Sequence, residues 1–281
     1  MNNFDYEAFF LNALTEDIQK GDYTTLACVD KTSKGKAKLL AKQNGILAGI
    51  DIITKFYKFY NKEISLDIFY KDGDIIAKND IIFEISGKSQ DILSTERIVL
   101  NILQRMSGIA TTTRMYVIET VGTKAKILDT RKTTPGFRFL EKEAVRIGGG
   151  VNHRFGLYDM IMIKDNHIDY AGGIEKAITK TKKYLDEKKI DLKIEIEARN
   201  FEEIEEIMQV GGVDRIMIDN FTPEDCKKAV VLINNKYETE ASGGININTV
   251  KSYADTGVNY ISVGAITHNY KSLDLSLKAV K

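Results

Sequence analysis

From residue 125 onward, short apolar segments alternate with amphipathic helical segments, which leaves few possible folds. The predicted strands cover residues 125–129, 158–164, 192–197, 214–219, 238–242 and 259–264. The predicted helices between them cover residues 137–147, 172–187, 201–210, 223–235 and 247–256. This repetition indicates parallel strands that are covered by helices. Several of the predicted strands, such as residues 158–164 and 214–219, are apolar at successive positions, which is typical of strands buried on both faces.

Nearly every predicted strand ends in a reactive or anion-binding residue, and this distinguishes a barrel from an open sheet. These residues are Asp129, with Arg131 and Lys132 just beyond it, and then Lys164, Glu197, Asp219, Ser242 and Gly264. In an α/β barrel the C-terminal ends of the strands meet at one mouth, whereas an open sheet spreads them along an edge. Because residues 125–264 are fewer than the roughly 200 residues of a full eight-unit barrel, we expect an incomplete α/β barrel of six or seven strands.

The residues before this repeat show a less regular mixture of helix and strand signals. Residues 36–43 and 80–88 are predicted strands, and residues 89–108 are a predicted helix that Gly108 interrupts before a second helical stretch. We therefore predict two domains, an N-terminal α/β domain and the barrel. Their predicted bounds are residues 1–115, with residues 269–281 packed back on them, and residues 116–268.

The overall composition excludes several classes of partner. The net charge is zero, so broad attraction to nucleic acid or to an anionic membrane surface is not expected. The first residues lack the features of a signal peptide, and no uncharged apolar stretch is long enough to span a bilayer. The two cysteines, Cys28 and Cys226, are too few for a disulfide framework and form no CxxC pair. We therefore expect a cytoplasmic protein without nucleic-acid or membrane partners.

Arginine is concentrated in the middle of the chain. Seven of the nine arginines lie between Arg97 and Arg154, and two of the three histidines lie between His153 and His167. The planar guanidinium of arginine binds a carboxylate or phosphate through two hydrogen bonds. Arginines interleaved with glycine and histidine therefore predict a pocket for a compact anionic ligand. The alternative is ordinary surface charge that happens to cluster.

Two motifs in this region combine basic side chains with turns. Arg131 and Lys132 follow a predicted strand in the sequence TRKTTPG, where adjacent side chains point in opposite directions and can hold two anionic groups. His153 and Arg154 follow three glycines, which allow the backbone to approach a ligand closely, and Lys164 ends the next strand. The alternatives are a solvated basic turn for the first motif and a glycine helix cap beside a structural histidine for the second.

Glu197 and Asp219 end consecutive predicted strands, so their carboxylates should face one another across neighbouring barrel positions. Two carboxylates beside a substrate that carries pyrophosphate form a typical magnesium site. The alternative for this pair is a buried ion pair with lysine or arginine. Glu195 should point the same way as Glu197 but lie deeper, or instead pair with a basic residue.

The last two junctions between strand and loop carry the sequences ASGGIN (241–246) and SVGAITH (262–268). Small residues with free backbone N–H groups that open toward a helix form an anion cradle, and barrels frequently hold phosphate at their final two loops. A phosphate site is therefore predicted from Ser242, Gly243, Gly244 and Gly264, with His268 beside it.

Together these motifs resemble the quinolinate phosphoribosyltransferase family, whose members are also called carboxylating nicotinate-nucleotide pyrophosphorylases. The resemblance is carried by TRKTTPG, GGGVNHRFGLYDMIMIKDNHI (148–168), DNF (219–221), EASGGI (240–245) and GVNYISVGAITH (257–268), and it begins at residue 16. The family implies an N-terminal α/β sandwich-like domain plus an incomplete α/β barrel, in a homodimer or a larger even assembly. It also implies that phosphoribosyl passes from phosphoribosyl pyrophosphate to quinolinate with decarboxylation. The products are nicotinate mononucleotide, pyrophosphate and CO2, with Mg²⁺ required, in de novo NAD synthesis.

The resemblance further implies roles for individual residues. Arg131, Arg154 and Arg97 match arginines around the quinolinate carboxylates, and Arg97 would come from the other subunit. His153, Lys132 and Lys164 match the basic residues that complete this pocket and reach the phosphoribosyl substrate. The acidic pair matches carboxylates near the ribose and the magnesium, and the two glycine junctions match the phosphate cradle. The expected catalytic residues are Lys132, Lys164, Glu197 and Asp219.

Three alternative functions remain open from the sequence. The first is a paralogous phosphoribosyltransferase-like protein of the same fold that is linked to molybdenum transport. The second is a Schiff-base aldolase that uses Lys164 at a barrel mouth. The third is a non-catalytic sensor that binds an anionic metabolite. The complete TRKTTPG and NHR motifs and the density of arginines favour the quinolinate enzyme.

Overall fold

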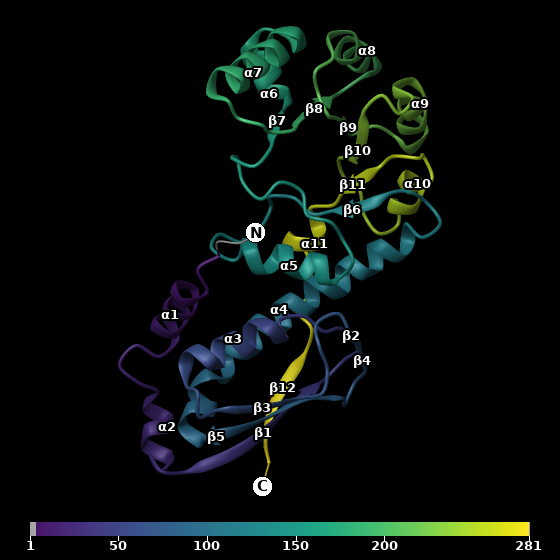
Figure 1. The fold of residues 1–281 in the computed structure, drawn as a ribbon. Helices are drawn as coiled ribbons and strands as arrows, with labels where there is room; N and C mark the ends of the chain where they lie inside the picture. Colours follow the sequence, from purple (N-terminus) through teal and green to yellow (C-terminus); the bar gives the residue numbers. More distant parts are fainter. Residues whose placement is uncertain (1–3, 281) are drawn as a thin grey trace. The chain divides into compact units, whose positions relative to one another are not determined.

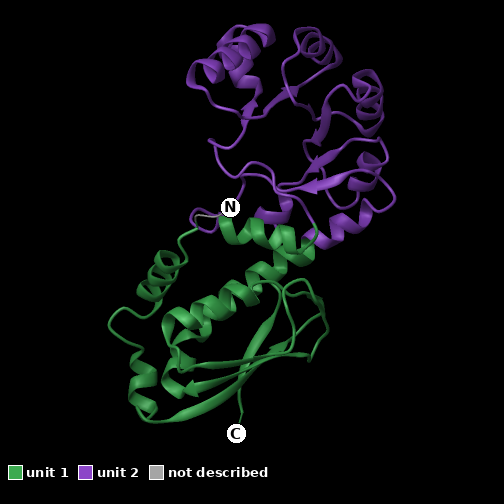
Figure 2. Cartoon of the chain, viewed as in Figure 1, with its two compact units in different colours: residues 1–112, 139–149, 270–281 green, residues 113–138, 150–269 purple. Residues whose placement is uncertain are grey.

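The computed structural model describes residues 4–280 of the chain, which divide into two compact units (Figure 2). Unit 1 comprises residues 1–112, 139–149 and 270–281, and unit 2 comprises residues 113–138 and 150–269. No helix among the described residues is both long enough and apolar enough to cross a membrane.

Unit 1 is built on an antiparallel sheet with the strand order β12-β1-β5-β3 (Figure 1). Its strands are β1 (Lys34–Ala41), β3 (Ser65–Ile68), β5 (Ile81–Lys88) and β12 (Leu275–Val280), and a separate two-stranded ladder joins β2 (Gly45–Ile46) to β4 (Ile75–Ile76). The helices are α1 (Tyr6–Asp17), α2 (Tyr23–Cys28), α3 (Ile50–Tyr60), α4 (Ser89–Glu119, whose end belongs to unit 2) and α5 (Arg138–Ile147, whose first residue does). Alternate residues of β1 are buried from Ala37 to Ala41, as expected for a sheet with one face against helices.

Helix α4 runs through Gly108 without a break, so the predicted interruption there is wrong. A side chain at this position would place its Cβ 2.2 Å from the carbonyl oxygen of Lys271. The missing side chain allows the segment that leads into β12 to lie directly against the helix. Gly108 therefore serves close packing within unit 1, and this contact could not be read from the sequence.

The segment from residue 139 to 149 groups with unit 1, although the predicted domain bounds put it in the barrel. The ring of Phe139 stacks on that of Phe4 with their centroids 4.3 Å apart. Arg105 of α4 donates from Nε to a carboxylate oxygen of the fully buried Glu141 over 2.9 Å, and its guanidinium lies over the ring of Tyr270. These contacts, which join residues far apart in the sequence, attach most of α5 to unit 1.

Unit 2 is an incomplete barrel of six parallel strands, as predicted from the strand–helix alternation (Figure 1). In spatial order the strands are β6 (Lys126–Leu128), β11 (Tyr260–Ser262), β10 (Glu238–Ser242), β9 (Arg215–Asp219), β8 (Ile194–Ala198) and β7 (Ile161–Ile163). The helices are α6 (Asp165–Ala171), α7 (Ile174–Lys188), α8 (Phe201–Val210), α9 (Pro223–Ile233), α10 (Val250–Ala254) and α11 (Ala265–His268). Among the described strands, β6 and β7 are the two edges and do not pair with each other.

The glycine-rich segment after α5 lies at the free edge of β6. Val151 forms a parallel bridge with Leu128, and its amide donates to the carbonyl of Ile127 over 2.8 Å. Strand β7 begins only at Ile161, three residues later than predicted, because the carboxylate of Asp159 accepts hydrogen bonds from backbone amides four and three residues before it. Such local bonds favour a turn over a strand.

Candidate active site

The C-terminal ends of the unit 2 strands surround a cavity of about 900 Å³. Every predicted site residue of this unit lines it: Arg131, Lys132, His153, Arg154, Lys164, Glu197, Asp219, Ser242, Gly243, Gly244, Gly264 and His268. This agrees with a barrel, in which the C-terminal ends of the strands lie together at one mouth. Arg97 does not line the cavity and is exposed on α4. Glu240, a buried residue of β10 that lines the cavity, was not predicted from the sequence. The acidic residues at alternate positions of that strand could have indicated it.

Two guanidinium groups lie at this cavity within electrostatic reach of each other. Burial lowers the pKa of Arg154, and the positive charge of Arg131 lowers it further. The Nε of Arg131 is buried, and no described residue accepts a hydrogen bond from it. Arg154 donates from Nη1 to the carbonyl oxygen of Met160 over 3.2 Å. An anion bound between the two guanidinium groups would offset their mutual repulsion and would accept the hydrogen bond that the buried Nε–H of Arg131 can donate.

The loop after β6 is held against the last strand–helix junction. The hydroxyl of Thr267 donates to the carbonyl oxygen of Lys132 over 3.0 Å. A Cβ at Gly264 would lie 3.1 Å from Cδ of Lys132 and 3.2 Å from the ring of His268. Glycine at this position therefore leaves room for a cationic side chain beside backbone N–H groups, which is suitable for phosphate.

An acidic pair faces the same cavity from β8 and β9. Glu197 accepts a hydrogen bond from Nζ of Lys164 over 2.5 Å and one from the amide of Asp165 over 3.2 Å. Burial raises the pKa of Asp219, and the negative charge of Glu197 adds to that increase, while Lys164 opposes it. Glu197 thus lines the cavity and also forms an ion pair with lysine, which the sequence analysis gave as the alternative to a magnesium site.

The loop after β10 turns sharply into the cavity. Gly243 and Gly244 have φ values of +97° and +62°, in the left-handed region that favours glycine. A Cβ at Gly243 would collide with Asn220, whose Oδ1 would be 2.1 Å away. Asn220 donates in turn to Asp219 over 2.6 Å. The glycine is therefore required both by its backbone conformation and by the asparagine that supports the acidic pair.

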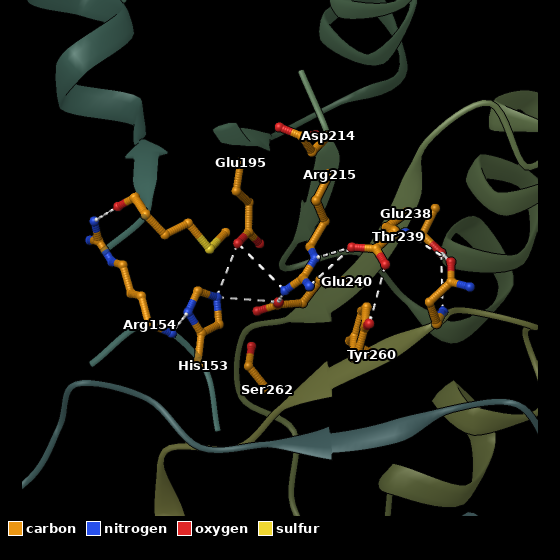
Figure 3. Close-up of polar contacts among 12 residues, drawn as sticks. His153, Arg154, Glu195, Asp214, Arg215, Glu238, Thr239, Glu240, Tyr260 and Ser262 are labelled. Atoms are coloured by element: carbon orange, nitrogen blue, oxygen red, sulfur yellow. Dashed lines mark hydrogen bonds and ion pairs between the residues drawn. The ribbon is translucent and has the colours of Figure 1, made fainter. Parts of the chain in front are cut away.

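A buried polar cluster lies among the side chains of β8, β9 and β10 (Figure 3). The Nε2 of His153 lies 3.0 Å from Oε2 of Glu195 and 3.4 Å from Oε2 of Glu240, and both carboxylates are fully buried. Arg215 reaches Glu240 at 3.0 Å and Glu195 at 3.7 Å. The predicted deep position of Glu195, and its pairing with basic residues, are therefore both found in the structure.

The electrostatics of this cluster favour retained protons. Burial alone would lower the pKa of His153, but its contacts with Glu195 and Glu240 raise that pKa to about 9. Burial, together with the charge of Glu240, raises the pKa of Glu195 to about 7. Because Nδ1 of His153 accepts the backbone N–H of Arg154 over 2.6 Å, the proton of the ring lies on Nε2. The additional proton that the raised pKa values imply belongs to the carboxylates, which cannot both ionise cheaply at such close range.

This chain is similar to known proteins in sequence and in structure. Its sequence matches the family models described as quinolinate phosphoribosyl transferase, N-terminal domain, over residues 22–107 and C-terminal domain over residues 109–278. It is 43% identical over 277 residues to the probable carboxylating nicotinate-nucleotide pyrophosphorylase of Bacillus subtilis (strain 168), covering 99% of this chain and 94% of the relative. It is 41% identical over 290 residues to the chloroplastic carboxylating nicotinate-nucleotide pyrophosphorylase of Oryza sativa subsp. japonica, covering 98% of this chain and 78% of the relative.

The fold is also similar to solved structures. The crystal structure of NadC from Streptococcus pyogenes superposes with a TM-score of 0.93 at 37% sequence identity, covering 100% of both chains. The nicotinate-nucleotide pyrophosphorylase of Francisella tularensis superposes with a TM-score of 0.92 at 39% identity, covering 99% of this chain and 98% of the other. The similarity therefore extends over both units and is not limited to the cavity motifs.

Proposed function

The chain belongs to the quinolinate phosphoribosyltransferase family, and from the geometry of its cavity we propose how its residues carry out the family's reaction. It transfers phosphoribosyl from phosphoribosyl pyrophosphate to quinolinate with decarboxylation, in de novo NAD biosynthesis. The products are nicotinate mononucleotide, pyrophosphate and CO2. The comparisons give no support to a molybdenum-transport paralogue or to an aldolase.

We propose that Arg131 and Arg154 bind the two carboxylates of quinolinate. The observation that carries this assignment is the pair of mutually repelling guanidinium groups at one cavity, one of which has a buried Nε without an acceptor among the described residues. An adjacent pair of carboxylates supplies both the missing charge and the missing acceptor. His153 and Lys132 complete this end of the cavity.

The phosphoribosyl donor is assigned to the acidic and glycine-rich part of the lining. Ser242 ends β10, Gly243 and Gly244 follow it, and Gly264 precedes α11, so backbone N–H groups at both junctions are available to phosphate oxygens. His268 lies beside Gly264, within reach of the same anion. This arrangement supports phosphate binding at the last two loops.

Magnesium is part of the same proposal, and the carboxylates of Glu197 and Asp219 would hold it. The donor set fits, because both groups offer hard oxygen ligands and the pKa of Asp219 is raised in part by the charge of Glu197, which a cation would offset. Lys164 and the Asp165 amide already donate hydrogen bonds to Glu197. The ion would neutralise charge on the departing pyrophosphate.

In the first step the ring nitrogen of quinolinate attacks the anomeric carbon while the bond to pyrophosphate breaks. Positive charge develops on the ribose, and Glu197 and Asp219 are placed to stabilise it. In the second step the neighbouring carboxylate leaves as CO2, and its electron pair remains on the ring carbon beside the positively charged nitrogen. A proton then replaces CO2 on that carbon. Lys132 and Lys164 are the ammonium groups of the lining that can supply it.

A homodimer or larger even assembly, with Arg97 acting across the interface, completes the proposal. It is supported by the exposure of Arg97 on α4, which leaves its guanidinium accessible to a second chain. We also propose a cytoplasmic location, which the free thiols of Cys28 and Cys226 fit because a reducing compartment keeps thiols unpaired.

The test of the function is to mix the purified protein with quinolinate, phosphoribosyl pyrophosphate and Mg²⁺. Formation of nicotinate mononucleotide, with CO2 in equal amount, is expected, and omission of any one component should abolish it. A well-folded preparation that binds quinolinate without turning it over would instead identify a sensor. Covalent trapping of a carbonyl substrate by borohydride would identify an aldolase.

A further inference from the structure

We propose that Glu195, Glu240 and Arg215 form a positioning network beneath the cavity, which holds the imidazole of His153 in one orientation and, through it, sets the position of Arg154. The three residues are called the positioning network below. This inference deepens the proposed function, because it rests on the assignment of His153 and Arg154 to the quinolinate end of the cavity.

The network is assembled by three adjacent strands. In the sheet register, Glu195 of β8 lies opposite Arg215 of β9, and Glu240 of β10 lies one strand further along. Oε2 of Glu195 and Oε2 of Glu240 both approach Nε2 of His153, at 3.0 Å and 3.4 Å. Figure 3 shows the two carboxylates and the guanidinium converging on one side of the imidazole. The ring is therefore restrained at Nε2 from two strands.

The other side of His153 is restrained by the backbone. Its Nδ1 accepts the amide N–H of Arg154 over 2.6 Å, and its own amide donates to Oδ1 of the fully buried Asp129 over 2.8 Å. A rotation of the ring would break the Nδ1 bond and release the Arg154 amide. Because the guanidinium of Arg154 also donates to the carbonyl of Met160, both ends of this arginine are held in place.

Stability alone is a weak reason to bury these charges. Desolvation of carboxylates and a guanidinium commonly costs as much as their mutual attraction returns, and apolar replacements of similar volume are often as stable. Glu195 and Arg215 do not line the cavity, so they can influence a ligand only through their neighbours. A network of this kind is best explained by the geometry that it imposes on His153, which contacts two of its carboxylates and itself lines the cavity.

A bound metal ion is the competing explanation, because ligand atoms of His153, Glu195 and Glu240 lie within 4.8 Å of one another. Arg215 argues against it, since its guanidinium is 3.0 Å from Glu240 and 3.7 Å from Glu195 and supplies the positive charge from the protein itself. Arg215 is further fixed by Glu238 at 3.1 Å and by the ring of Tyr260, 4.0 Å away. A cation would have to displace a well-anchored arginine.

The experiment separates position from charge with three variants of one residue. Glu195→Gln keeps the length of the side chain and can still accept a hydrogen bond from Nε2–H of His153. Glu195→Asp keeps the negative charge but places it farther from the imidazole. Glu195→Ala removes both the charge and the hydrogen-bond acceptor. We expect the KM for quinolinate to rise about 10- to 30-fold in the alanine variant and by an intermediate factor in the aspartate variant, since a buried charge-assisted hydrogen bond is lost. The glutamine variant should stay within about 5-fold, and the KM for the phosphoribosyl donor within about 3-fold throughout.

The orientation of the ring is measured directly by ¹⁵N NMR of the imidazole nitrogens, which needs no substrate. The protein has three histidines, so the signals of His153 can be assigned with a His153→Gln variant. We expect one tautomer, with Nε2 protonated and Nδ1 accepting, in the wild type and in Glu195→Gln, and tautomer averaging in Glu195→Asp and Glu195→Ala.

The control is Glu141→Gln, which weakens a fully buried carboxylate–arginine pair within unit 1. It should lower the melting temperature while leaving the His153 signals and the ratio of the two KM values unchanged.

The inference is overturned if Glu195→Asp and Glu195→Ala retain the wild-type His153 tautomer, or if they raise both KM values equally. A stoichiometric metal that copurifies with wild type and is lost from Glu195→Ala would also overturn it. Failure of the wild type to make nicotinate mononucleotide would contradict the proposed function but leave the NMR test of the network intact.

Discussion

Nζ of Lys164 lies 2.5 Å from Oε1 of Glu197, so an ion pair joins the C-terminal ends of β7 and β8 at the cavity. Glu197 is mostly buried, whereas the lysine side chain remains 44% exposed. An ammonium group that is paired with the protein but still reachable from the cavity can contact a substrate without moving far. The pair therefore links the residue assigned to the ribose with one assigned to proton delivery.

We expect Lys164→Ala and Glu197→Gln to be strongly non-additive. Each single variant should lower kcat by roughly 100-fold, because each disrupts a preorganised charge at the reacting centre. The double variant should be little worse than the poorer single one, since residues in contact share one interaction energy. Steady-state kinetics on the four proteins of the cycle measure this, and multiplicative losses in the double variant would show that the two residues act independently.

Replacement of Arg131 should affect one substrate selectively. Arg131→Ala is expected to raise the KM for quinolinate by about 100-fold, in line with loss of about 3 kcal/mol from a charge-assisted contact to a carboxylate. The KM for phosphoribosyl pyrophosphate should change little. Arg131→Lys is the matched variant, which keeps the charge without the planar fork and should recover only part of the affinity. Equal effects on both substrates would contradict the assignment.

The buried cluster around His153 should make the stability of the fold depend on pH. The pKa of His153 is raised from 6.5 to about 9 and that of Glu195 from 4.5 to about 7, so the folded cluster, with the additional proton on its carboxylates, binds this proton more tightly than the unfolded state does. The stabilisation is complete below pH 6.5 and is lost as pH rises toward 9, by at most about 3 kcal/mol. Urea unfolding from pH 6 to pH 9.5 measures it. Glu195→Gln, which removes a carboxylate that holds the additional proton, should lack most of this pH-dependent loss, and an unchanged pH profile in that variant would refute the prediction.

Gly243 should tolerate no side chain. Gly243→Ala combines a φ of +97° with a Cβ placed 2.1 Å from Oδ1 of Asn220, so the loop must move. We expect a loss of about 1–3 kcal/mol of stability and a higher KM for phosphoribosyl pyrophosphate. Gly73→Ala is the matched control, because its φ is +91° but no atom lies within 4 Å of the new Cβ. That variant should show the cost of backbone strain without any change in KM.

Regular local signals were enough to predict the barrel. The six strands of unit 2 are short apolar runs between amphipathic helices, and both periodicities depend only on neighbouring residues. The end of each strand could be predicted from where its apolar run stops. The prediction that Lys164, Glu197 and Asp219 meet at one cavity then needed only the rule that parallel barrel strands have their carboxyl ends at the same mouth.

Contacts between distant segments could not be predicted in this way. Gly108 reads as a helix breaker, but the helix continues because the glycine accommodates the backbone of Lys271. Most of α5 reads as part of the barrel, but Phe139 and Glu141 join it to unit 1 through partners more than thirty residues away. In both cases the structural role of the residue depends on a partner far away in the sequence, so the residue type alone does not predict it.

The order of strands and helices, the incomplete barrel and most of the charged residues at its mouth could be predicted from the sequence, because these follow from local periodicity and from where each strand ends. The place of Glu240 at the cavity and the pairing of the charges are visible only in the folded protein. Glu197 binds Lys164, and Glu195 lies beneath it against His153, although the two acids occupy the same strand two residues apart. Pairing depends on side chains brought within about 3 Å by different strands, and no local pattern in the chain encodes that distance.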